Sequence, residues 1–155
     1  MSKVEQWARV RRLGDGDDMR AASLDFSSED RRDATYIRYD LIEDLNERYP
    51  NRPPLYADEP TAFFGQLLHI LVVRLPPAQI TALRSETTYI LAAVHRCVVS
   101  ARNSMDMPIY DRMGRIEVVD ITSVQCLIGR VPVGTQWAII DRTGEVQQSV
   151  HVRDD

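Results

Sequence analysis

Cysteine and histidine are scarce in this sequence, whose 155 residues include two cysteines and three histidines. Cys97 and Cys126 form neither a CxxC pair nor a zinc-ligand spacing, so nothing indicates a redox dithiol or a zinc finger. Each lies in an apolar run, where a free thiol behaves as a small hydrophobic side chain. We therefore predict two buried, unpaired cysteines and no cofactor.

Long apolar runs and a secretory signal are also missing. The longest apolar stretch, residues 67–75, contains His69 and Arg74 and is far shorter than the roughly 20 residues that span a bilayer. Residues 1–7 lack the apolar core and the cleavage site of a signal peptide. The sequence predicts an intracellular protein that does not bind membranes.

Phosphate-binding glycine loops and a strongly basic charge are absent as well. Gly14 and Gly16 lack the third glycine and the lysine of a nucleotide loop. The formal net charge is −4, and basic residues are mostly interleaved with acidic ones, which argues against a broad phosphate-binding face. No serine or cysteine lies in a recognisable active-site motif. These absences predict a protein that is not an enzyme.

The sequence does contain a series of strand-like segments. Residues 63–75 and 90–99 are rich in β-branched and apolar residues and predict two long strands. Residues 115–120 alternate in polarity, and residues 126–131 and 137–141 flank a glycine-containing turn that predicts a hairpin. With shorter strands at 7–13 and 146–152, the pattern predicts a mainly β fold, an antiparallel barrel or sandwich of six to eight strands with few short helices. An α+β fold is the alternative.

Two segments between these strands have special roles. Residues 35–45 fit both a strand and one face of a helix, and we favour the strand because of its tyrosines and β-branched residues. The proline-rich residues 49–60 predict an extended crossover, since proline lacks an amide proton and constrains the residue before it. The length suits one domain, so we predict a single β-rich domain over residues 1–155.

Aromatic residues close to an arginine gather on both sides of the crossover. Rings offer a large contact area at a small entropic cost, which makes them candidates for binding a ligand or partner. The hydrophobic core is the alternative role for half or more of them, and Trp137 is predicted to lie in the core rather than to serve as a ligand platform. The candidate binding residues are Tyr36, Arg38, Tyr39, Tyr56, Phe63 and Phe64.

Two alternative sites remain open. A nucleic-acid site would use arginines around the tyrosines, namely Arg9, Arg11, Arg12, Arg38 and Arg52. A metalloenzyme site would use His69, His95 and Cys97, because His95 and Cys97 share one strand face.

Several stretches resemble the C-terminal domain of fungal transposon-encoded proteins related to large cut-and-paste transposases. They are WARVRR (7–12), EDRRDATYIRY (29–39), FFGQL (63–67) and VDITSVQCLIGRV (119–131). The order of the strands is also similar to that of a bromo-adjacent homology (BAH) domain, a chromatin-associated β-barrel, in which residues 118–131 would be the closing strands. These resemblances imply ancestry in a mobile element and a nuclear location, and they assign no catalytic residue.

The sequence thus leads to one principal hypothesis. It is a non-catalytic interaction module that binds a protein segment or a chromatin component, by strand addition at an open sheet edge.

Overall fold

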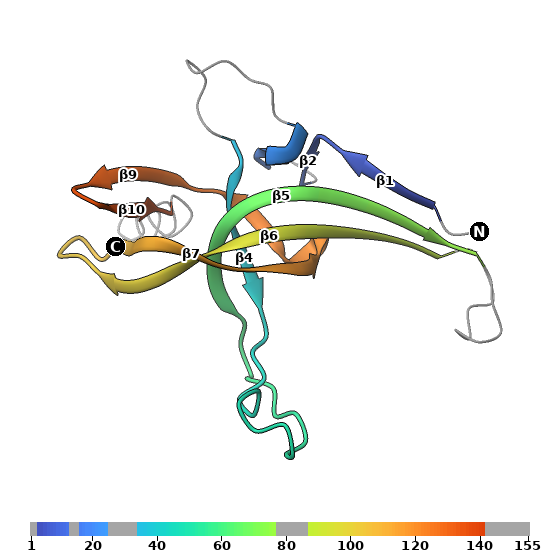
Figure 1. Ribbon diagram of the computed structural model, residues 1–155, viewed down its shortest axis with the longest axis horizontal. Coiled ribbons are helices and arrows are strands. Elements are labelled where there is room, and N and C mark those ends of the chain that lie inside the picture. Colours follow the sequence, from blue (N-terminus) through green and yellow to red (C-terminus); the bar gives the residue numbers. More distant parts are fainter. Residues whose placement is uncertain (1–2, 13–15, 25–33, 77–86, 142–155) are drawn as a thin grey trace, which may run out of the picture.

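A computed structural model describes residues 3–12, 16–24, 34–76 and 87–141 of the chain. These residues form an antiparallel sheet of eight strands and a separate sheet of two strands (Figure 1). The strands are β1 (Lys3–Trp7), β2 (Arg9–Arg11), β3 (Asp18–Arg20), β4 (Tyr36–Leu41), β5 (Thr61–Leu75), β6 (Thr87–Arg102), β7 (Pro108–Asp120), β8 (Val124–Leu127), β9 (Gly129–Val133) and β10 (Gln136–Ile140). Two short 3₁₀ helices, Ala22–Leu24 and Ile121–Ser123, complete the described elements.

The large sheet follows the path β8-β4-β5-β6-β7-β10-β9, with β1 beside β5. The strands at the two ends of this path, β8 and β9, are consecutive in the chain and only Ile128 lies between them. The amide of Ile128 donates to the carbonyl of Tyr36 at 3.0 Å. The sheet therefore bends over itself into a sandwich-like fold, and one stretch of chain connects its two ends.

Strands β5, β6 and β7 are long and bent (Figure 1). Along one edge of β5, the neighbouring strand changes from the first half to the second. The first half of β5 pairs with β4 and the second half with β1. Gly65 lies opposite Arg96 at the point where β5 and β6 begin to pair. A Cβ atom at Gly65 would lie 2.5 Å from the His95 carbonyl oxygen, so only glycine permits this close approach of the two backbones.

Apolar side chains are buried on both faces of the sheet around β4 and β5. One cluster contains Ile37, Tyr39 and Leu67 together with Ile70 and Val94. A second cluster lies on the other face. It contains Phe64, Cys97, Tyr110, Ile128 and Ile139. The fold therefore has two hydrophobic clusters, with the first half of β5 between them.

Most of the predicted strands are confirmed. The ambiguous residues 35–45 contain strand β4, and residues 63–75 and 90–99 lie within β5 and β6. The predicted hairpin is β9–β10, which turns at Gly134 with a φ of 62°. Residues 7–13 hold the end of β1 and all of β2 instead of one strand. The predicted strand at 146–152 lies outside the described residues.

The start of β7 was predicted wrongly. The strand begins at Pro108, whereas the predicted alternation covers only residues 115–120. Polar Asp111 and Arg112 are exposed, so this half of the strand lacks the apolar alternation that marks residues 115–120.

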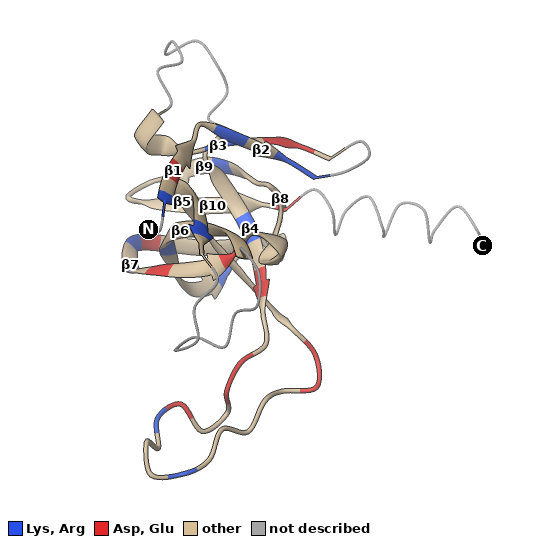
Figure 2. Ribbon diagram, turned by 90° about the vertical axis from the view of Figure 1, so that its right-hand side faces the viewer, with Lys and Arg blue, Asp and Glu red and all other residues tan. Residues whose placement is uncertain are grey.

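The proline-rich crossover connects the antiparallel neighbours β4 and β5. Residues 42–60, here called the tongue, project away from the sheet in both ribbon views (Figures 1 and 2). The tongue contains one isolated bridge, between Asp44 and Tyr56. Among the described residues, no helix is long and apolar enough to cross a membrane.

Candidate functional site

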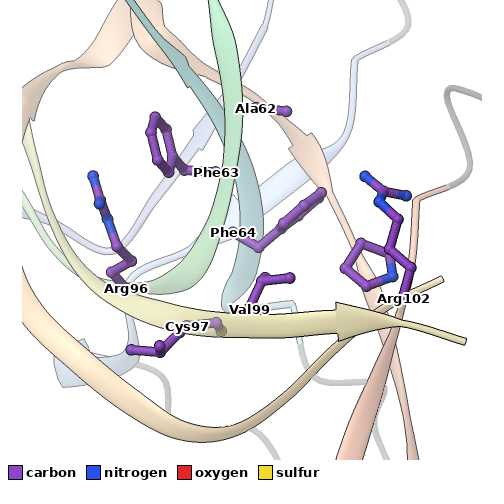
Figure 3. A pocket seen from close by; sticks show the side chains of 9 residues that line it. Ala62, Phe63, Phe64, Arg96, Cys97, Val99 and Arg102 are labelled. Carbon is purple, nitrogen blue, oxygen red and sulfur yellow. The ribbon is translucent and has the colours of Figure 1, made fainter. Parts of the chain in front are cut away.

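Strands β5 and β6 separate beyond Gly65 and leave a cleft between them (Figure 3). Residues 61–64 of β5 remain paired with β4, and residues 97–102 of β6 remain paired with β7. In the described part of the chain, no ladder joins these two halves to each other. The cleft has a volume of about 360 Å³ and is lined by Ala62, Phe63, Phe64, Arg96, Cys97, Val98, Val99, Arg102 and Pro108.

The side chain of Arg96 is fixed at one end of the cleft by hydrogen bonds. Its Nε and an Nη atom donate to the two carboxylate oxygens of Glu117 at 2.7 and 3.1 Å. Its guanidinium also lies 4.1 Å from the ring centroid of Phe63. Such bidentate pairing and stacking hold an arginine in one orientation. The wall formed by Arg96 and Phe63 is therefore preorganised.

Tyr39 supports this wall from the hydrophobic core. Its hydroxyl donates to Glu117 Oε1 at 2.7 Å, and its ring lies 5.8 Å from that of Phe63. Burial raises the pKa of Tyr39 above its usual range, and the Glu117 carboxylate raises it further. Tyr39 therefore stays protonated and acts as a hydrogen-bond donor.

Cys97 lies at the floor of the cleft in the second hydrophobic cluster. Burial raises its pKa from an ordinary value of 9.0 to about 11, although its contact with Tyr110 acts in the opposite direction. A thiol with a raised pKa is a poor nucleophile near neutral pH. Cys97 therefore lines the cleft as an apolar group, and both cysteines are free and buried, as predicted.

We expect the native protein to lose stability at alkaline pH. The raised pKa of Cys97 means that the thiol loses its proton more readily in the unfolded chain, so stability is complete below pH 9.0 and falls as the pH rises toward about 11. The expected loss at the upper end is about 2 kcal/mol. Urea unfolding at several pH values checks this, and Cys97→Ala should remove the part of the loss that begins near pH 9.0, whereas Tyr39 and Tyr110, whose pKa values burial also raises, still contribute above pH 10.0. Unchanged alkaline sensitivity in Cys97→Ala would contradict the assignment.

Two of the predicted binding residues, Tyr39 and Phe64, are buried, and two others, Tyr36 and Arg38, are partly exposed. Tyr39 and Phe64 are buried in the two clusters, on opposite faces, because neighbouring strands place alternate residues on alternate faces. Arg38 binds Asp40 and Asp141 at 3.0 and 3.1 Å. Tyr36 stacks against the guanidinium of Arg130, 3.5 Å from its ring centroid. The assumed exposure is therefore wrong for Tyr39 and Phe64, although Phe64 still contributes one side to the cleft, whereas Tyr36 and Arg38 keep part of their surface exposed.

The remaining two predicted residues, Tyr56 and Phe63, border the same hollow. Tyr56 is 63% exposed, and it borders, with Phe63, a second hollow next to the tongue. Trp137, predicted as core, is half-buried and packs on the second cluster with Arg130 over its ring.

The arginines of the nucleic-acid alternative do not form one surface. Arg9 and Arg11 lie exposed on β2, whereas Arg52 lies on the tongue, stacked on Tyr49. Arg12 donates to the carbonyl of Val124 at 3.1 Å, and Arg38 is held by the two carboxylates already described. Of the five arginines, only Arg9, Arg11 and the adjacent Arg12 lie together, along β2, and we call these three the basic stripe.

The metalloenzyme alternative is not supported. Among the residues described, no group of three or more histidine, cysteine, aspartate or glutamate side chains could hold a metal ion. His69 lies opposite Ala93, and His95 lies opposite Gln66. A β-bulge between Leu67 and His69 interrupts the register of β5 and β6. The hypothesis required the two strands to pair in register, and the bulge breaks that register.

Sequence reasoning missed most of the cleft. Ala62, Val99, Arg102 and Pro108 carry no motif, and they meet only because β5 and β6 separate after Gly65. Gly65 is the one sequence signal that marks this place, because a glycine inside a strand often indicates a bulge or a close approach of two backbones.

No family model, curated protein or solved structure matches the chain.

Proposed function

We propose that this chain is a non-catalytic interaction module that binds an extended segment of another protein in the cleft between β5 and β6. A chromatin protein is one such partner, and descent from a mobile-element protein belongs to the same proposal. The observation that carries it is the pair of facing strand edges, residues 61–64 and 97–102, which have no ladder to each other in the described part of the chain. Unpaired strand edges are the usual acceptors of an added strand.

The side chains around the cleft suit an extended segment. Phe64 and Val99 provide apolar contact, and Arg102 adds a cation at the end of β6 (Figure 3). In strand addition, backbone hydrogen bonds supply affinity and alternate side chains enter the flanking spaces. The fixed wall of Arg96 and Phe63 lowers the loss of side-chain freedom on binding.

A matched pair of variants tests this proposal. Val99 in the cleft and Val131 on β9 are each 42% exposed, so replacing either with glutamate places a similar charge on the surface. We expect Val99→Glu to weaken binding of peptides selected from a random display library by about tenfold or more, because it buries a charge against the bound segment. Val131→Glu should leave that binding unchanged. Equal effects of the two variants, or failure to select any peptide, would contradict the proposal.

Nucleic acid is a second candidate partner. Arg9 and Arg11 are exposed on β2, and Arg11 and Arg12 border a hollow of about 510 Å³ with Val10 and Ile90. Polarisation of labelled single- and double-stranded DNA would detect such binding, and affinity that falls steeply with added salt would support it. A flat salt response, or binding unchanged by Arg11→Ala, would exclude this stripe.

A further inference from the structure

The tongue is an ordered projection that is held together by its own hydrogen bonds. The amide of Leu45 donates to the carbonyl of Leu55 at 2.7 Å, and the amide of Ala57 donates to the carbonyl of Glu43 at 2.9 Å. The Asp44 carboxylate accepts from the Leu55 amide at 2.9 Å. These bonds join the outgoing and returning halves of the tongue, so its surface has a defined shape.

Large apolar side chains on the tongue are exposed. Because water disfavours such surface, a concentration of it on one projection marks a site of interaction. The exposed residues are Ile42, Leu45, Tyr49, Leu55 and Tyr56.

The charge of the tongue is unbalanced. Residues 42–60 include five acidic side chains, Glu43, Asp44, Glu47, Asp58 and Glu59, but only two basic ones, Arg48 and Arg52. Figure 2 shows acidic residues on both sides of the tongue where it leaves the sheet. The combination of apolar and acidic surface is complementary to a basic, partly apolar segment and repels a phosphate backbone.

A hollow of about 300 Å³ lies between the tongue and the sheet. Ile42, Tyr56 and Phe63 give it an apolar side, and Glu43 and Glu47 are among the acidic residues that border it. A ring next to carboxylates is the arrangement that binds the stem and the charged end of a lysine or arginine.

The chain itself shows that this hollow accepts a guanidinium. Arg115 lies 3.6 Å from a carboxylate oxygen of Glu47 and 3.6 Å from one of Glu117. The exposed Glu43 carboxylate has no ion-pair partner among the described residues. Arg96 and Arg115 both border the hollow, and one of its acidic groups is left for a cation from another molecule.

We propose that this hollow binds an arginine or lysine side chain of a basic segment from another protein, whose apolar neighbours cover the exposed face of the tongue. This surface is separate from the cleft in which we propose strand addition. The two hollows share Phe63 and Arg96, but Tyr56 and Glu43 border only the one at the tongue.

The test is selection of short random peptides by display on the intact protein and on two double variants. Tyr56→Ala with Glu43→Gln removes the ring and the free carboxylate of the hollow. Tyr89→Ala with Asp111→Asn is the matched control, because both residues are exposed and lie on the sheet, outside the tongue and outside the residues that border the hollow. Urea unfolding verifies that both variants fold.

We expect the intact protein to enrich peptides with arginine or lysine beside apolar residues. Their affinity should fall about tenfold with the hollow variant, should stay the same with the control variant, and should weaken with added salt. Enriched peptides without basic residues, no enrichment at all, or equal binding to both variants would overturn the inference. Val99→Glu distinguishes the two surfaces, since it should impair cleft peptides and leave tongue peptides unaffected.

Discussion

Gly65→Ala is expected to destabilise the protein by about 3 kcal/mol or more, or to prevent folding. The added Cβ atom would lie 2.5 Å from the carbonyl oxygen of His95 and 2.7 Å from Cγ1 of Val94. The nearer of these is a backbone atom, which cannot rotate away, so β5 and β6 would have to move apart where their pairing begins. Urea unfolding followed by tryptophan fluorescence measures the effect.

Gly129→Ala is the matched control for this prediction. Gly129 also lies in a strand, but the atom nearest to an added Cβ would be Cβ of Ile140 at 3.5 Å, an ordinary contact. We expect its stability to change by less than about 1 kcal/mol. If the two alanine variants were equally stable, the close approach of β5 and β6 would not be a constraint on the fold.

The second large effect concerns the ion pair of Arg96 and Glu117. Replacing Glu117 with alanine leaves the guanidinium of Arg96 and the hydroxyl of Tyr39 without their shared acceptor in a mostly buried place. Breaking one side of such a pair is expected to lower the free energy of unfolding by about 3 kcal/mol. Thermal and urea unfolding of Glu117→Ala check this value.

Two further variants distinguish the stability lost by breaking this ion pair from the general effect of removing a charge. Arg74 and Glu5 form an ion pair of 2.6 Å on the surface, with side chains that are 34% and 51% exposed. Glu5→Ala should therefore change stability by less than about 1 kcal/mol. The double variant Arg96→Met with Glu117→Leu should recover part of the loss, since no charge is left unpaired. Equal losses in Glu5→Ala and Glu117→Ala would contradict the role assigned to the buried pair.

The sequence predicted the strands well where local composition decides the structure. Residues 63–75 and 90–99 are rich in β-branched residues, and they lie in β5 and β6. Strand β7 was recognised only in its second half, because the first half, which contains Asp111 and Arg112, lacks the apolar alternation. The fold class followed from such patterns, whereas the order of strands in the sheet did not.

The site was harder to predict because it depends on contacts between distant residues. Tyr39 and Phe64 belong to adjacent strands, and nothing local shows that both faces of these strands are covered. A cluster of aromatic residues in the sequence therefore suggested an exposed surface where the structure has two cores. The cleft itself arises because the ladder between β5 and β6 ends at Gly65 and Arg96, while β4 and β7 stay paired with the other edges of these two strands.

The connection between β8 and β9 has a consequence for the way in which the chain acquires its structure. β8 completes one end of the sheet against β4, and β9 completes the other end against β10, with Ile128 between them. During synthesis, neither end of the sheet can be completed before this late segment has emerged, even though β4 emerges early. Pairing between such distant parts of a chain is slow and leaves strand edges exposed in the meantime. Until residues 124–140 have left the ribosome, the edges of β4 and β7 that later pair with β8 and β10 therefore lack these partners.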